Sequence, residues 1–277
     1  MISVDNNSNF GFYKPNTLVS IIILITRSIG STWLSKRIIF ILRRIAIIFS
    51  KNCIDTTLFN SNLRMYTKGN VSEKRALFSP QIFEEEERNF IAEKAEDNSI
   101  FIDIGANIGL YSFSIANTYK KYKNTKIYSI EPHPGLFKRL SFNVSLNKDI
   151  PIYPREIALM DKSGQFNLST PEENLGQGVI SKKGKNLVTA KNLLGFINDE
   201  GIKKISAMKI DVEGNEEKII IPFLKDANEE QLPIIIVIEN NQELWKNDLI
   251  KLLEEKGYII QKKTRMNYIL KLNNSNN

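Results

Sequence analysis

A carboxylate and two glycines stand between an apolar run and an expected helix. Residues 101–110 read Phe-Ile-Asp-Ile-Gly-Ala-Asn-Ile-Gly-Leu, so Asp103 precedes Gly105 and Gly109. Glycine lets the backbone turn tightly and lets a ligand approach the main chain, and a side chain at Gly105 is expected to occupy space that the ligand needs. The spacing differs from the Gly-x-Gly-x-x-Gly fingerprint of dinucleotide sites, which holds a pyrophosphate. A carboxylate here instead favours a cofactor with an ammonium group, S-adenosylmethionine, over NAD.

A second acid follows the next apolar run. Glu131 lies 28 residues beyond Asp103 and is followed by Pro132 and His133. At the end of a strand, an acid can accept hydrogen bonds from both hydroxyls of a ribose, and this role is favoured over that of a simple acid before a helix. His133 is the single histidine, and we interpret it as structural rather than as a catalytic base.

A third charged group ends another apolar run. Residues 208–216 read Met-Lys-Ile-Asp-Val-Glu-Gly-Asn-Glu, and the alternation places Lys209, Asp211 and Glu213 on one side of the chain. Clustered charges at a strand end are costly unless function uses them. Enzymes that methylate exocyclic base nitrogens commonly carry an Asn/Asp-Pro-Pro-aromatic motif here. This chain has no proline in that place, which favours oxygen over nitrogen as the methyl acceptor.

Strands that alternate with helices after residue 97 must position these groups, and the alternation predicts a parallel sheet. The expected strands are 99–104, 126–130, 152–157, 205–210, 233–238, 258–262 and 268–272. The expected helices are 83–94, 109–122, 134–147, 192–199, 215–225 and 242–255. Residues 164–190 are expected to form a hairpin and loop. The acidic run at 84–87 is expected to be a solvated helix start.

The last two expected strands have no helix between them, which predicts that the final strand inserts antiparallel to the others. The fold class is therefore α/β: a Rossmann-like methyltransferase fold with a seven-stranded, mostly parallel sheet, preceded by a helical N-terminal segment. A chain of 277 residues accommodates such a domain, expected at 81–277, together with an appendage at 1–80.

Several of these motifs together resemble the FkbM-type methyltransferases, a family of mostly hydroxyl-methylating enzymes. The resemblance covers roughly residues 97–272 and leaves 1–80 outside it. The matching residues are 104–109 with Tyr111 and Ser112, then Glu131 with Pro132, Asn143 and Asn147, residues 209–214 with Glu216, and 234–239. One departure is Pro222, which interrupts a segment that the family usually keeps helical.

The resemblance implies roles for particular residues. It implies S-adenosylmethionine as the cofactor, with Glu131 on the ribose and with Glu156 and Ile157 beside the adenine. The residues implied around the methionine end are Asp103, Gly105, Ala106, Asn107, Gly109, Ser112 and Pro132. It places the catalytic groups Asp211, Glu213 and Glu239 toward the acceptor, with Asp211 as the first choice for the base and Lys209 as an orienting cation. No metal site is predicted, although carboxylates at Asp211 and Glu239 leave a bound cation open.

Charge is distributed unevenly along the chain. Residues 14–68 hold nine Lys and Arg against one acid, Asp55, whereas the net charge of the whole chain is +7. The catalytic part is nearly neutral, which disfavours a nucleic-acid substrate. The lone Cys53 has no metal-spaced partners and fits a reducing compartment.

Two apolar runs, 18–26 and 38–50, are each too short to span a bilayer, which takes roughly 18–20 residues. Three hypotheses remain for them, the first being favoured: helices that pack on the catalytic domain or on a second subunit, a basic amphipathic helix on an anionic membrane face, or a membrane anchor.

The sequence thus predicts an O-methyltransferase acting on a hydroxyl of a small molecule or glycan, such as a sugar or lipid-linked saccharide. The alternative is a non-catalytic protein of the same fold that serves as a membrane-surface or assembly module. The expected location is cytoplasmic, with peripheral membrane contact through the N-terminal segment and homo-oligomer formation left open.

Overall fold

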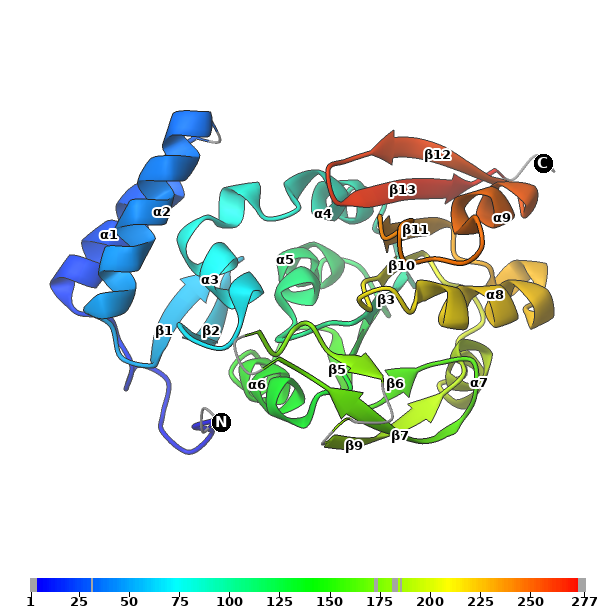
Figure 1. The fold of residues 1–277 in the computed structure, drawn as a ribbon, viewed down its shortest axis with the longest axis horizontal. Helices are drawn as coiled ribbons and strands as arrows, with labels where there is room; N and C mark the ends of the chain where they lie inside the picture. The colour runs from blue at the N-terminus through cyan, green and yellow to red at the C-terminus, as the bar shows by residue number, and fades with distance from the viewer. Residues whose placement is uncertain (1–3, 31, 172–173, 181–183, 185, 274–277) are drawn as a thin grey trace.

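A mixed sheet forms the centre of the molecule. The computed structural model describes residues 4–30, 32–171, 174–180, 184 and 186–273, and within them seven strands form this sheet in the order β12-β13-β11-β10-β3-β4-β5 (Figure 1). The strands are β3 (Ile100–Ile104), β4 (Lys126–Ile130), β5 (Ile152–Arg155), β10 (Ala207–Ile210), β11 (Ile235–Glu239), β12 (Tyr258–Lys263) and β13 (Asn267–Leu272).

The sheet has the predicted topology. Strands β11, β10, β3, β4 and β5 pair in parallel, and β13 lies antiparallel between β11 and β12. The predicted seven-stranded sheet with an antiparallel last strand is therefore confirmed.

Alternating side chains divide the core into two layers, one on each face of the sheet. Phe101, Ile127 and Val237 belong to one buried cluster, whereas their neighbours Ile102 and Tyr128 belong to the other. This follows from the period of two along a strand, which sends successive side chains to opposite faces. Because both faces are covered, the parallel strands are apolar almost throughout.

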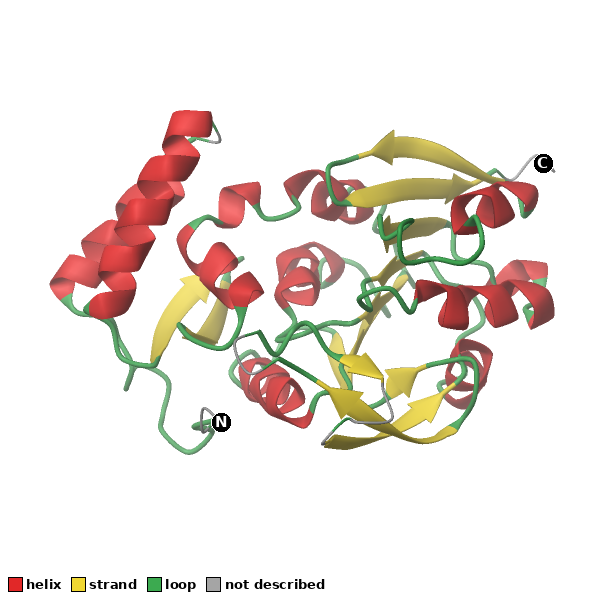
Figure 2. Cartoon of the chain, viewed as in Figure 1, coloured by secondary structure: helices red, strands yellow, loops and turns green. Residues whose placement is uncertain are grey.

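Helices cover both faces of the sheet (Figure 2). One face packs against α4 (Glu85–Ala92), α5 (Leu110–Tyr119) and α6 (Pro134–Ser145). The other packs against α7 (Leu193–Asp199), α8 (Glu216–Asp226) and α9 (Leu249–Glu255). Helix α8 continues through Pro222, so that residue does not shorten it.

Two helix predictions need correction. The helix expected at 242–255 begins only at Leu249, because the Asp248 side chain caps it by accepting from the Lys251 amide. The turn before it is held by Trp245, whose indole donates to Glu216 (2.9 Å). The acidic run is only partly a solvated helix start. Glu85 and Glu86 are exposed, but Glu87 is buried and accepts hydrogen bonds from Thr264 and Asn267.

Residues 158–191 build a second, smaller sheet instead of only a hairpin and loop. Its order is β6-β9-β7-β8, with β6 (Ala158–Leu159), β7 (Gly164–Ser169), β8 (Val179–Ile180) and β9 (Asn186–Lys191). Residues 172–173, 181–183 and 185 of the predicted loop lie outside the described residues.

The N-terminal segment contains helices and a β-hairpin. Helices α1 (Thr17–Ser28) and α2 (Trp33–Ile48) pack on each other, followed by β1 (Cys53–Leu58), β2 (Ser61–Tyr66) and α3 (Val71–Phe78). The hairpin was not predicted. Its turn places Phe59 (φ 51°) and Asn60 (φ 55°) in the left-handed region, and a phenylalanine there lacks the Asn-Gly signal that usually marks such a turn.

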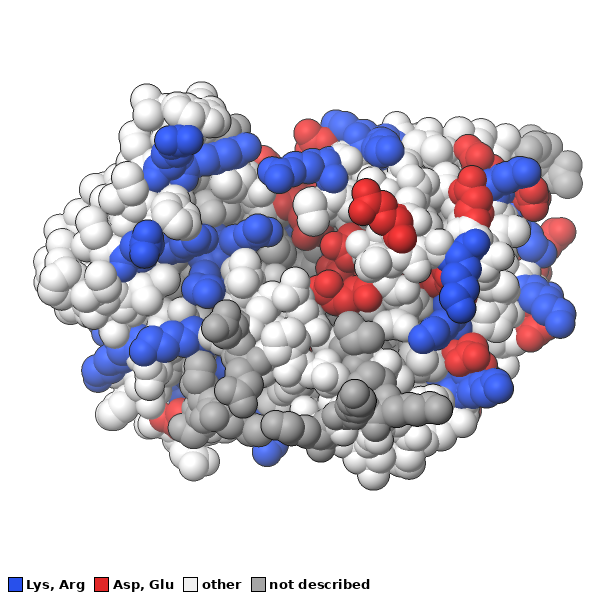
Figure 3. Space-filling model, in the orientation of Figure 1, with Lys and Arg blue, Asp and Glu red and all other residues white. Residues whose placement is uncertain are grey.

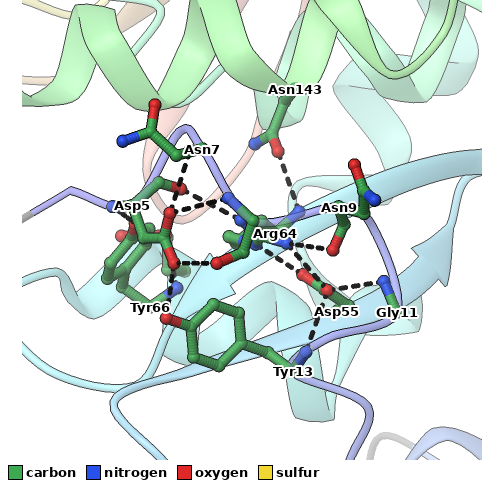
Figure 4. Close-up of polar contacts among 11 residues, drawn as sticks. Asp5, Asn7, Asn9, Gly11, Tyr13, Asp55, Arg64, Tyr66 and Asn143 are labelled. Carbon is green, nitrogen blue, oxygen red and sulfur yellow. Dashed lines mark hydrogen bonds and ion pairs between the residues drawn. The ribbon is translucent and has the colours of Figure 1, made fainter.

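A buried ion pair fixes the hairpin and the chain before it (Figure 4). Arg64 on β2 bonds to Asp55 on β1 (2.7 Å), with both side chains almost fully buried, and it donates to the carbonyls of Asp5 and Asn9. The Arg64 amide donates to Asn143 on α6 (2.8 Å). The N-terminal segment is thereby hydrogen-bonded directly to the sheet domain.

Candidate functional site

A cavity opens at the carboxyl ends of β3, β4 and β10. This is the edge at which ligands bind in open α/β sheets. Its wall includes residues that follow each of these strands, together with residues of the small sheet and of the chain before α4. Acidic side chains gather near the middle of the face shown in Figure 3.

Most of the predicted site residues line this cavity. They are Asp103, Gly105, Ala106, Asn107, Glu131, Pro132, Ile157, Lys209, Asp211 and Glu213. Four others do not contribute to its wall: Gly109, Ser112, Glu156 and Glu239. Of these, Glu156 is exposed, whereas Ser112 and Glu239 each contact a residue that does line the cavity.

The glycine loop is shaped by its neighbours on both sides. The amides of Gly105 and Ala106 donate to the Ile130 carbonyl (3.0 and 2.9 Å), and Gly105 has φ 81°. A Cβ on Gly105 would collide with the backbone carbonyl of Asp211. A side chain at this position would therefore displace the end of β10, in addition to occupying the space that we expect the ligand to need.

Asp103 is buried beneath the loop. Ser112 Oγ donates to its Oδ2 (2.6 Å) and lies 2.7 Å from Ser129 Oγ. Burial raises the pKa of Asp103, and the charge of Lys209 opposes that rise. Among the described residues, Asp103 Oδ1 has no hydrogen-bond partner. An unpaired buried oxygen is costly and marks a position where a ligand donor would be stabilised.

Glu131 connects the two loops. Its Oε2 accepts from the Asn107 amide and its Oε1 from the His133 amide, both at 2.8 Å. Burial raises the pKa of Glu131 to about 8, and these two amides only partly offset that rise. His133 caps α6 through Nδ1, which accepts from Gly135 and Leu136, so its structural role is evident.

Lys209 and Asp211 form an ion pair at the end of β10, the strand next to β3. Lys209 Nζ donates to Asp211 Oδ2 (2.7 Å) and lies 5.2 Å from the centre of the Tyr111 ring. Burial opposes the charge on Lys209, but Asp211, Glu84 and Asp103 together raise its pKa above the ordinary value. The single cation thus neutralises part of a dense acidic group.

Two further carboxyls complete this group. Burial, followed by the charge of Asp211, raises the pKa of Glu239 to about 8, and Asn241 Nδ2 donates to this side chain (2.7 Å). Burial and Asp211 also raise the pKa of Glu213 to about 7. Glu213 holds a left-handed backbone (φ 54°), a strained conformation that a non-glycine residue keeps only where the surroundings impose it.

Glu84 is a cavity residue that sequence reasoning missed. It lines the wall near Lys209, has φ 44°, and burial raises its pKa to about 7. The run of four glutamates concealed it, because nothing in the run distinguishes the inward-facing member from its solvated neighbours.

The arrangement suits group transfer between two organic ligands. Buried acceptors at the ends of β3 and β4 face one part of the cavity, and carboxyls with a raised pKa lie near the end of β10. Within the residues that the structure describes, no cluster of His, Cys, Asp and Glu has the arrangement of a metal site.

Comparison with known proteins agrees with this geometry. The profile of the family described as the Methyltransferase FkbM domain matches residues 103–260. The chain belongs to the FkbM methyltransferase family. The matched span begins at Asp103 and includes every acidic residue of the cavity wall except Glu84.

Two curated FkbM relatives have similar sequences. The methyltransferase sdnD of Sordaria araneosa is 28% identical over 204 residues, covering 59% of this chain and 74% of the relative. The hexuronic acid methyltransferase AglP of Haloferax volcanii is 26% identical over 168 residues, covering 60% of this chain and 65% of the relative.

A solved FkbM methyltransferase from Methylobacillus flagellatus KT aligns with 72% of this chain and 54% of its own length, with 16% identity and a TM-score of 0.44.

Proposed function

We propose that this protein transfers a methyl group from S-adenosylmethionine to a hydroxyl of a small molecule or glycan. The observation that supports this most strongly is the pairing, within one cavity, of buried acceptors on β3 and β4 with a group of near-neutral-pKa carboxyls beside β10. A relative named as a hexuronic acid methyltransferase favours a sugar as the acceptor.

The cavity fits the proposed cofactor. Asp103 Oδ1 is a buried acceptor without a partner, which suits a group of donors such as an ammonium or its hydrogen-bonded neighbours. Glu131 is a buried carboxyl whose ionised form two hydroxyl donors would stabilise, as a ribose provides. Ile157 and Leu159 add an apolar wall suited to a flat base. When bound, S-adenosylmethionine supplies an electrophilic methyl carbon.

The chain's own residues would remove the acceptor proton. The acceptor oxygen would gain the methyl carbon as the carbon–sulfur bond of the donor breaks and its electron pair stays on sulfur, and the acceptor's proton would pass to a carboxylate. Asp211, our first choice from the sequence, is held by Lys209. Glu213 lines the cavity, and among the described residues none hydrogen-bonds its carboxyl. Burial raises its pKa to about 7, which is close to the optimum for a base at neutral pH. We therefore assign the role of general base to Glu213. Asp211 would instead hold Lys209 in position.

The Glu213→Gln variant tests this proposal. Methyl transfer to sugar hydroxyls should fall about 100-fold or more, while affinity for S-adenosylhomocysteine stays near that of the unchanged protein. In the unchanged protein, kcat/KM should rise as pH increases through about 7, because the base must be ionised, and the variant should lose that dependence.

Asp211→Asn serves as the matched comparison. If it removes the pH-dependent limb and Glu213→Gln does not, Asp211 is the base. If the unchanged protein transfers methyl groups to amines but to no hydroxyl acceptor, the choice of oxygen is wrong.

A further inference from the structure

The outer surface of the α1–α2 hairpin exposes large apolar side chains. Leu24 is 69% exposed, Trp33 67% and Ile48 76%. The others that are at least one-third exposed on these two helices are Leu18, Ile21, Ile25, Leu34, Ile38, Phe40, Ile41 and Ile45. On α2, the members at 34, 38, 41, 45 and 48 recur every three or four residues and so form one continuous stripe. A surface this apolar marks an interaction site.

The opposite face of the hairpin packs against the rest of the protein. Val19, Ile22 and Ile23 of α1 join the same buried cluster as Phe101 of the central sheet. Gln81 Nε2 donates to the carbonyls of Thr26 and Ile29 (2.9 and 2.8 Å). The hairpin therefore packs on the domain, as the sequence favoured, and its outward apolar residues are additional to that packing.

Basic groups border the exposed stripe. Arg44 lies three residues after Ile41 and four before Ile48, so it is their neighbour on the helix surface. Arg37 stacks on the Trp33 ring at 4.1 Å, and Arg43 lies 5.3 Å from the Phe40 ring. From residue 6 to residue 54 the sequence contains no Asp or Glu. Lys and Arg intersperse with uncharged side chains over this part of the molecule in Figure 3.

We propose that the outer α1–α2 surface docks on an anionic lipid bilayer. Apolar and aromatic side chains flanked by Arg and Lys, without acids, match a membrane whose interior is apolar and whose surface is negative. The helices have 12 and 16 residues, and no helix of the described chain has the length and hydrophobicity needed to cross a bilayer. The hairpin would lie in the interface.

Charge also argues against a second copy of the chain as the occupant. Two such surfaces brought together would oppose Arg37, Arg44 and their basic neighbours to one another, with no acid on either helix to pair with them. Like charges facing each other across an interface are repulsive. An anionic surface removes that conflict and gains from every basic residue.

Sedimentation of the full chain with vesicles tests the docking surface. We expect it to sediment with vesicles that mix phosphatidylglycerol and phosphatidylcholine at low salt, and to be released as salt is raised. Vesicles of phosphatidylcholine alone should bind at least about tenfold more weakly. Absence of binding to the anionic vesicles at low salt would overturn the proposal, as would equal, salt-independent binding to both kinds.

Two double variants and a control locate the surface. Arg37→Gln with Arg44→Gln should weaken vesicle binding by about tenfold or more, and Ile41→Ser with Ile48→Ser should also weaken it. Lys203→Gln with Lys204→Gln removes the same charge from an exposed segment between α7 and β10 and should leave binding unchanged. If Lys203→Gln with Lys204→Gln weakens binding as much as Arg37→Gln with Arg44→Gln does, net charge and not this surface governs it.

The oligomeric state distinguishes the competing occupant. The surface is an interface between copies if the unchanged protein is a dimer and binds no vesicles, and if the Ile41→Ser, Ile48→Ser variant is a monomer. Affinity for S-adenosylhomocysteine, measured on every variant, should stay constant because none of these residues lines the cavity. Failure of the docking proposal would therefore leave the proposed methyl transfer untouched.

Discussion

Buried carboxyls with raised pKa values are the main feature of this molecule at the scale of single residues. Burial raises the pKa of Glu131 and Glu239 to about 8 and of Glu213 and Glu84 to about 7. Three of these line one cavity and the fourth, Glu239, adjoins it. Such clustering is typical of functional sites, because burying several acids close together is costly unless function uses them.

Glu131→Gln is expected to weaken S-adenosylhomocysteine binding by about tenfold to a hundredfold, because it removes the charge that would accept two hydroxyls but keeps the shape. Calorimetric titration measures this change. Glu156→Gln, an exposed position one strand away, is the control and should bind like the unchanged protein. Equal affinity for both variants would remove Glu131 from the ribose position.

Much of the candidate site could be predicted because its residues follow strands. Asp103, Glu131 and Asp211 each stand where an apolar run ends, and the carboxyl ends of parallel strands meet at one edge. Glu84 could not be found in this way. It enters the cavity from a loop before α4, through a left-handed backbone that no local pattern of residues signals.

At the scale of elements, apolar runs and their spacing predicted the sheet but not every turn. Strands β3, β4 and β10 are buried on both faces, so each appears as a short continuous apolar run. The β1–β2 hairpin gave no such signal because its turn residues are Phe59 and Asn60, and Asn117 on α5 helps to hold that turn by donating to the Phe59 carbonyl (2.6 Å). The turn depends on tertiary contacts.

Gly105→Ala is expected to destabilise the fold by about 3 kcal/mol or more, since it adds strain at φ 81° and forces the β3 loop away from β10. Gly201→Ala is the matched control. Gly201 also has a positive φ (64°), but a Cβ there meets nothing within 4 Å, so a loss of only about 1 kcal/mol is expected. Denaturant unfolding of both variants measures the difference.

If the two alanine variants lost the same stability, strain alone would account for the glycine at 105. Close approach of the two strand ends would then have no energetic consequence.

At the scale of the whole molecule, the chain carries two surfaces of opposite character. The acidic cavity belongs to the carboxyl edge of the sheet, and the basic apolar surface belongs to α1 and α2. The buried Arg64–Asp55 pair and the shared hydrophobic cluster connect the N-terminal segment to the sheet domain.

The ligand-free protein should lose stability as pH rises from 6.5 to 8.5. The four glutamates of this group have an ordinary pKa of 4.5, so between that value and about 7 to 8 they bind more protons in the native state than in the unfolded state. Their stabilising contribution is present below their unfolded pKa and disappears as pH passes through the native values. Thermal melting at a series of pH values measures this.

The variant with both Glu131→Gln and Glu239→Gln should show a weaker pH dependence, since two of the four titrating groups are gone. A melting temperature that rises between pH 6.5 and 8.5 in the unchanged protein would show that these carboxyls are already ionised in the native state.

Calorimetric titration of the full chain with S-adenosylhomocysteine, repeated with NAD, tests the central claim most directly. The cavity's loop differs from a pyrophosphate cradle and its walls carry Asp103, Glu131 and Asp211. We therefore predict one S-adenosylhomocysteine bound per chain and no heat from NAD. No binding of S-adenosylhomocysteine, or its displacement by NAD, would contradict the assignment of this cavity to a methyl donor.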